Sequence, residues 1–207
     1  MVAIIDYGVG NLFSLKSSFS AIGAEALVTS DPDVIRGADK IILPGVGAFG
    51  DAAEKLSSSG LGDVLKEEAK KGKYVLGICL GMQLLFDKSY EYGEHNGLGL
   101  IKGEIRAISE VIPESYKIPH IGWNSLYLGK KKHELFKYLN DGDFVYFVHS
   151  FYAAKCEGSV IATADYGAPL TAAVASGNVM GCQFHPEKSG SVGLDILRAF
   201  LELGENK

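Results

Sequence analysis

Short apolar runs alternate with helix-like patterns through the first half of the chain. Continuous apolar runs predict strands at residues 2–5, 26–28, 40–43 and 74–78. Between them, apolar residues at helical spacing predict helices at residues 11–22, 49–58, 61–70 and 80–86. Buried strands separated by helices are typical of a parallel sheet that is covered on both faces.

The second half is mostly β-patterned. We expect strands within residues 143–154, 160–165 and 170–184, with a hairpin turn at Ser176-Gly177-Asn178, and a closing amphipathic helix at residues 190–203. The sequence shows no internal repeat or linker. We therefore predict one α/β domain over residues 1–207, in which a mostly parallel central sheet is flanked by helices and extended by antiparallel strands.

The composition argues against nucleic-acid binding and against a membrane span. Apolar residues make up 47% of the chain, and the net charge of −5 leaves no basic face for nucleic acid. The three cysteines are odd in number and widely spaced, which indicates reduced thiols in the cytoplasm. Asp6 interrupts any signal peptide, and the longest uncharged stretch, residues 166–186, contains a proline and a turn. We expect no membrane span.

The strongest predicted strand, residues 74–78, runs into the segment Gly77-Ile78-Cys79-Leu80-Gly81, and a helix begins directly after Cys79. This strand–turn–helix pattern is typical of a nucleophile elbow, here with cysteine as the nucleophile. The flanking glycines permit the sharp turn, and a sulfur at a helix N-terminus favours the thiolate. The alternative is that Cys79 is only a small buried hydrophobic residue.

A thiolate nucleophile needs a base, and His185 is the best of five histidines. It follows a β-patterned run and precedes Pro186, and Glu187 can reach back to its second ring nitrogen. His149 is the main competitor, but it has no acid nearby in the sequence, so a packed or substrate-lining role is expected. No Cys/His spacing matches a zinc site, and we assign no metal and no cofactor.

Attack on an amide also requires N–H donors for the oxyanion. One donor is the amide of Leu80, and the glycine-rich turn in residues 44–50 is suited to supply the second. The alternatives for this turn are an ordinary βα turn or a phosphate loop, although it lacks the lysine of a Walker motif.

Together these motifs resemble the class I (triad) glutamine amidotransferases, and within them the glutaminase subunits of imidazole glycerol phosphate synthases. The resemblance is carried by residues 5–12, 43–49, 77–83, 119–124, 146–150 and 183–189. It implies a flavodoxin-like arrangement of the sheet. The chain departs from the family at Phe151, where tyrosine is common, and at Glu94-His95-Asn96.

The resemblance implies that Cys79 attacks the side-chain amide of L-glutamine to form a thioester. The amides of Val46 and Leu80 would hold the oxyanion, and His185, oriented by Glu187, would transfer protons. The substrate contacts implied by the resemblance are Gly47, Gln83, Ser150 and Phe151. The products would be glutamate and ammonia.

The resemblance further implies a cyclase partner with a (β/α)8 barrel, forming a heterodimer. The cyclase would use the ammonia to make imidazole glycerol phosphate and an aminoimidazole carboxamide ribonucleotide (AICAR) in histidine biosynthesis. Interface candidates are Asn11, Trp123, Tyr146 and Lys188, although Trp123 could equally be a core residue. The alternatives are the glutaminase subunit of an anthranilate or aminodeoxychorismate synthase, a non-catalytic relative that only regulates a partner, and a cysteine hydrolase of another amide.

Overall fold

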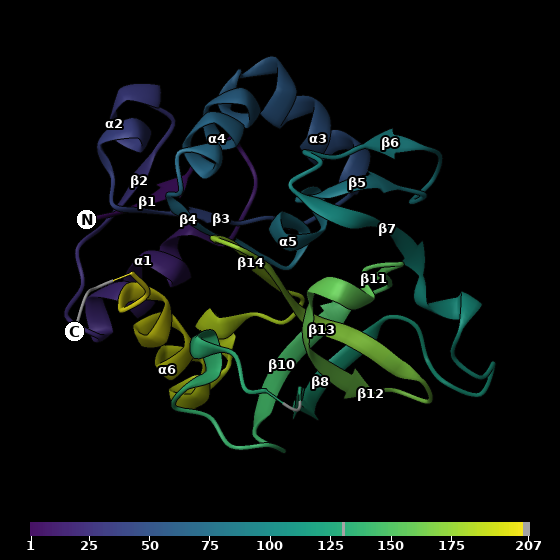
Figure 1. Ribbon diagram of the computed structural model, residues 1–207. Coiled ribbons are helices and arrows are strands. Elements are labelled where there is room, and N and C mark those ends of the chain that lie inside the picture. The colour runs from purple at the N-terminus through teal and green to yellow at the C-terminus, as the bar shows by residue number, and fades with distance from the viewer. Residues whose placement is uncertain (130, 205–207) are drawn as a thin grey trace.

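A central eight-stranded sheet organises the chain (Figure 1). The computed structural model describes residues 1–129 and 131–204. The strand order is β2-β1-β3-β4-β14-β13-β12-β9, and the pairs from β2 to β14 are parallel, whereas those from β14 to β9 are antiparallel. The first strands are β1 (Val2–Ile5), β2 (Ala26–Thr29), β3 (Lys40–Leu43) and β4 (Tyr74–Ile78). The last strands are β9 (Tyr127–Leu128), β12 (Val160–Asp165), β13 (Pro169–Ser176) and β14 (Val179–Cys182).

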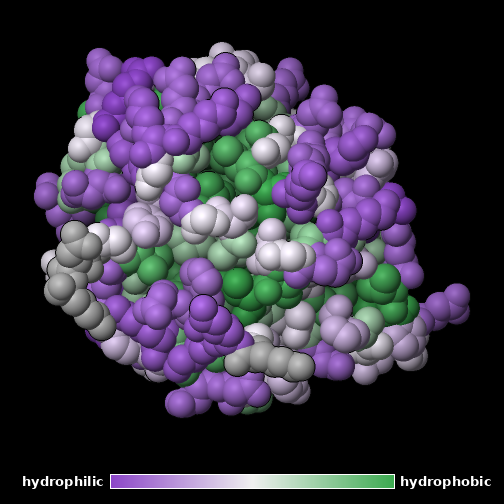
Figure 2. Space-filling view, viewed as in Figure 1, coloured by the Kyte–Doolittle hydropathy of each residue, from purple (hydrophilic) through white to green (hydrophobic). Residues whose placement is uncertain are grey.

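Helices cover both faces of this sheet, which leaves two separate hydrophobic cores. One face is covered by α2 (Pro32–Gly37), α3 (Phe49–Ser58), α4 (Leu61–Lys70) and α5 (Leu80–Leu84). The other face is covered by α1 (Leu12–Ala21) and α6 (Gly190–Leu201). Within the described residues, no helix has both the length and the apolar character needed to cross a membrane. Figure 2 shows hydrophilic side chains over most of the viewed face, densely so over α2 and α4.

Two smaller sheets stand beside the central one and bear on the site. A four-stranded sheet has the order β11-β7-β5-β6, and a two-stranded ribbon pairs β8 with β10. The ranges are β5 (Phe86–Ser89), β6 (His95–Asn96), β7 (Ile101–Ala107), β8 (His120–Ser125), β10 (Phe144–His149) and β11 (Phe151–Ala154).

The predicted α/β architecture is confirmed, and several elements have the predicted bounds, but the sequence pattern misleads at one place. The helix predicted at residues 80–86 ends at Leu84, because the Leu85 carbonyl accepts hydrogen bonds from Leu100 and Ile101 (2.8 and 3.0 Å) and Phe86 joins a strand. The strands predicted within residues 143–154 are confirmed. They are β10 and β11, which Ser150 separates and which belong to different sheets. The short helix α2, which Asp31 caps, was not predicted.

A methyl group at Gly81 would test how tightly α5 packs against the loop after β3. A Cβ atom built there would lie 1.9 Å from the Leu43 carbonyl oxygen, which is a backbone atom and cannot yield as the end of a flexible side chain can. We expect Gly81→Ala to lower the free energy of unfolding by about 3 kcal/mol, measured by urea denaturation.

Gly37→Ala is the matched control, because nothing lies within 4 Å of a Cβ atom at that position. Its effect should stay within about 0.5 kcal/mol. Equal stabilities of the two variants would contradict the packing described here.

Candidate active site

Cys79 joins β4 to α5 in a strained backbone conformation. Its φ of 55° and ψ of −113° lie in a region that residues with side chains rarely adopt. Glycines stand two positions away on either side, and a Cβ atom on Gly77 would lie 2.7 Å from Met82 backbone atoms. The Cys79 N–H donates to the Cys182 carbonyl at 2.7 Å. The segment therefore has the sharp turn that the Gly-x-Cys-x-Gly pattern predicts.

His185 and Glu187 follow β14, the strand next to β4. His185 Nδ1 donates to Glu187 Oε1 at 2.8 Å, and both side chains are almost fully buried. A carboxylate can only accept, so the proton on Nδ1 is held there and Nε2 faces Cys79. Among the described residues, Nε2 has no hydrogen-bond partner of good geometry. The Cys79 sulfur is nevertheless close enough to raise the pKa of the His185 ring. The structure thus brings Cys79, His185 and Glu187 together.

The charge of His185 is set by competing effects. Burial lowers its pKa, but the Cys79 thiol and the Glu187 carboxylate raise it more, to about 9. The ring is therefore cationic at neutral pH. A cationic imidazole beside a thiol can give a proton to a leaving group, as general acid catalysis requires.

Cys79 and His185 open into a cavity of about 310 Å³, within the size range of small-molecule sites. The predicted substrate and oxyanion residues that line it are Val46, Gly47, Leu80, Gln83, Ser150 and Phe151. Their side chains or backbones therefore surround the thiol, as the sequence motifs led us to expect.

The loop after β3 lies directly against the start of α5. A Cβ atom on Gly45 would lie 2.6 Å from the Gly81 nitrogen, so only glycine allows this approach. Tyr7 anchors the loop by donating to the Pro44 carbonyl at 2.7 Å. Leu80 is the first residue of α5, and the N–H groups of a first helical turn have no acceptor within their helix.

Gln83 is buried, so its interpretation as a solvated helix residue is wrong. Its Nε2 donates to the Phe151 carbonyl (3.2 Å) and to Gln183 Oε1 (3.0 Å). Both amide hydrogens are therefore used, and the side chain offers the pocket an acceptor, Oε1. Gln183 in turn donates from its own Nε2 to Cys79 Sγ at 3.8 Å. The sequence motif around His185 contained Gln183, but its contact with the sulfur was not predicted.

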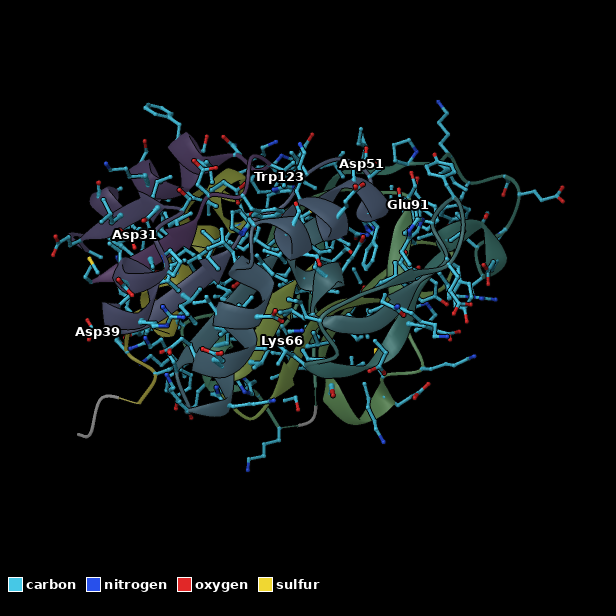
Figure 3. All side chains as sticks on the ribbon, turned by 90° about the horizontal axis from the view of Figure 1, so that it is seen from above. Asp31, Asp39, Asp51, Lys66, Glu91 and Trp123 are labelled. Atoms are coloured by element: carbon cyan, nitrogen blue, oxygen red, sulfur yellow. The ribbon has the colours of Figure 1, made fainter. Side chains whose placement is uncertain are left out.

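Glu91 is a second residue that the sequence did not reveal (labelled in Figure 3). Its carboxylate lines the cavity and accepts from the Phe49 N–H at 2.7 Å, at the N-terminus of α3. Burial raises its pKa against the lowering effect of that hydrogen bond, and the nearby Asp51 raises it further. Glu91 lies in an irregular loop, and no sequence pattern distinguished this buried acid from exposed ones.

His149 also lines the cavity, but its chemistry differs from that of His185. It is buried, and it has no carboxylate partner within the described residues. Burial lowers its pKa to about 3, so the ring is neutral and a poor base. The expectation of a packed, substrate-lining histidine fits this environment. His120, its neighbour, is buried and not available to a partner.

Three of the four interface candidates form one cluster on the surface. Trp123 is 56% exposed, so the alternative of a core tryptophan is wrong (Figure 3). Its ring packs edge-on against Tyr146, with the ring centres 6.1 Å apart, and Lys188 Nζ lies 5.9 Å from the Tyr146 ring centre. Asn11 stands apart from these contacts, at the start of α1. Within the described residues, no group of three or more His, Cys, Asp or Glu side chains could hold a metal ion.

Comparisons with known proteins agree with this geometry. The family "Glutamine amidotransferase class-I" matches residues 3–203. A Wolinella succinogenes protein named imidazole glycerol phosphate synthase subunit HisH is 51% identical over 99% of this chain and 100% of its own length. An Aquifex aeolicus protein of the same name is 48% identical over 98% of this chain and 96% of its own.

Solved structures show the same fold at lower identity. A structure titled "Crystal structure of glutamine amidotransferase" matches with a TM-score of 0.76 and 20% identity, covering 98% of both chains. The "Structure of PurLQS from Thermotoga maritima" matches with a TM-score of 0.74 and 21% identity, covering 97% of both chains.

The contacts of His185 with Cys79 and Glu187 make stability depend on pH. The His185 pKa is raised from 6.5 to about 9, so its protonation stabilises the folded chain below pH 6.5, and this is lost as the pH rises through about 9. The free energy of unfolding should therefore fall between these values. In Glu187→Gln we expect a lower His185 pKa by NMR titration and a shallower fall. Identical pH dependence in both proteins would contradict this.

Proposed function

Because the chain belongs to the class-I glutamine amidotransferase family, we propose that it hydrolyses L-glutamine to glutamate and ammonia as the glutaminase subunit of an imidazole glycerol phosphate synthase. One observation carries the proposal: Cys79, on a strained turn, and His185 line the same cavity, and Glu187 accepts a hydrogen bond from the other ring nitrogen of His185. The two relatives, about half of whose residues are identical to this chain's, bear the name of this subunit. This favours the imidazole glycerol phosphate synthase subunit over a subunit of an anthranilate or aminodeoxychorismate synthase.

The reaction proceeds through a thioester. His185 holds the proton that Cys79 gives up, and the resulting thiolate attacks the side-chain carbonyl carbon of glutamine. The amides of Val46 and Leu80 hold the oxyanion. His185 gives its proton to the departing nitrogen, which leaves as ammonia. The neutral ring then takes a proton from water, and the resulting hydroxide attacks the thioester and releases glutamate. Glu187 keeps the Nδ1 proton in place throughout.

The cavity offers groups of both kinds that an amino acid requires. Gln83 Oε1 and the Glu91 carboxylate are acceptors suited to the α-ammonium group of glutamine. The backbone at Gly47, Ser150 and Phe151 lines the remaining wall and faces the α-carboxylate. The acceptors Gln83 Oε1 and Glu91 favour a free amino acid, which carries an α-ammonium group, over a peptide amide, in which that nitrogen is acylated.

The partner is a cyclase with a (β/α)8 barrel, in a heterodimer in the cytoplasm. Ammonia in neutral water is mostly protonated and no longer nucleophilic, so it passes directly to the cyclase, which forms imidazole glycerol phosphate and AICAR for histidine biosynthesis. The exposed cluster of Trp123, Tyr146 and Lys188, with Asn11, is the proposed interface. Residues 1–207 act as one domain, and no cofactor takes part.

Removing the nucleophile separates the two half-reactions. In the complex with the cyclase, Cys79→Ala should lower glutamine-dependent synthesis by at least about 10⁴-fold, while synthesis from ammonium salts stays unchanged. Cys156→Ala is the control, because that buried thiol contacts Thr171 and not the cavity. Equal loss of both activities would discard this division, and full glutaminase activity of the variant would show that the chain is not a cysteine-dependent enzyme.

The charge of Glu91 can be removed without changing its shape. Glu91→Gln keeps an oxygen to accept from the Phe49 N–H but loses the negative charge. We expect KM for glutamine to rise about 10- to 100-fold, because a hydrogen bond to a charged group contributes about 1.5–3 kcal/mol. Steady-state assays of glutamate release would measure this. Glu54→Gln, at an exposed position of α3, is the control, and an equal KM in both variants would exclude Glu91 from substrate binding.

A further inference from the structure

Two buried histidines outside the catalytic group face each other across the β8–β10 ribbon. His120 and His149 are register partners, and His120 Nδ1 lies 2.9 Å from His149 Nε2. Their residues are only 2% and 6% exposed. His149 Nδ1 lies 2.8 Å from the carbonyl oxygen of Phe151, a residue that lines the cavity. The histidine pair is therefore linked to the cavity wall.

These side chains form a series of hydrogen bonds, and one carbonyl determines which atom is the donor in each bond. The Phe151 oxygen can only accept, so His149 carries its proton on Nδ1 and leaves Nε2 bare. His120 must therefore donate from Nδ1, which leaves its Nε2 bare to accept from Asn124 Nδ2 at 3.3 Å. Asn124 Nδ2 also donates to the Asp165 carbonyl at 2.8 Å. The bonds run in one direction, from Asn124 to Phe151.

Burial keeps both rings neutral, which this arrangement requires. It lowers the pKa of His120 to about 4 and that of His149 to about 3. The His120 ring is stacked between Phe147 and Tyr166, with ring centres 4.7 and 4.1 Å away. A neutral ring held between two aromatic faces cannot turn to exchange its nitrogens without breaking the packing.

The chain of bonds ends on the wall that faces the substrate. The Phe151 oxygen accepts from Gln83 Nε2 as well as from His149, so both of its lone pairs are used. Since Gln83 spends its amide hydrogens on Phe151 and Gln183, its Oε1 is the atom left for the cavity. The direction of one carbonyl therefore decides which atom of Gln83 the substrate meets.

We propose that His149 and His120 are positioning residues that hold the Phe151 carbonyl, and through it Gln83, in the orientation that binds glutamine. The inference rests on the proposed glutaminase function. The two histidines act on the wall of the cavity and take no part in proton transfer to the reacting atoms. Their effect should appear in the binding of glutamine more than in the rate of its breakdown.

Substitutions can separate the hydrogen bond from the volume of the ring. In the complex with the cyclase, His149→Phe and His120→Phe fill the space of the ring but interrupt the series of hydrogen bonds. We expect each to raise KM for L-glutamine about tenfold, with kcat within about threefold of the original value. His149→Asn retains an N–H near the position of Nδ1 and should return KM to within about threefold. A KM unchanged in His149→Phe, or equal in His149→Asn and His149→Phe, would overturn the proposal.

A spectroscopic readout does not depend on the variants or on activity. Two-bond ¹H–¹⁵N correlation spectra of the unsubstituted chain should show both imidazoles as the neutral Nδ1–H form. An Nε2–H form at either residue would overturn the proposal. If the unsubstituted complex hydrolysed no glutamine, the proposed function would fail, whereas this measurement would still report on the histidine pair.

Discussion

The chain must turn from β4 into α5 at a single residue, and Cys79 does so with a left-handed φ of 55°. Such a conformation costs about 1–3 kcal/mol and persists only where the surroundings hold it. Here the Cys79 N–H is bound to the neighbouring strand, its carbonyl accepts from Gln83, and Gly77 and Gly81 admit backbone where side chains would collide. The position of the sulfur, and with it the whole site, depends on this turn.

The two hydrophobic cores fix the position of β14 beside the turn at Cys79. Apolar residues on both faces of the sheet hold β4 and β14 parallel, with Ile78 opposite Cys182. Both strands end at the same edge, so Cys79 and His185 emerge next to each other although they are distant in the sequence. The carboxyl ends of adjacent parallel strands are where open α/β sheets build ligand sites.

Around this pair, polar groups are oriented by hydrogen bonds that leave little freedom. Gln183 contacts the Cys79 sulfur and Gln83, Gln83 contacts Phe151, and Phe151 is in turn held by His149. Gln83, Gln183 and His149 are buried, and a buried polar group left unpaired costs about 1–3 kcal/mol. The cavity wall is therefore prearranged, as binding of a small polar substrate demands.

The sequence by itself determined the elements with strong local signals. Strands such as β3 and β4, helices such as α3 and α4, and the turn at Cys79 follow from spacings of a few residues, which local sterics and burial impose. The proximity of His185 and Glu187 is likewise local, because only Pro186 separates them. Tertiary structure alone decided the break at Ser150, the early end of α5, the exposure of Trp123, and the presence of Glu91, Gln183 and His149 around the thiol. These features depend on pairings between segments far apart in the chain, and no local pattern encodes which strand edge or carbonyl will be the neighbour.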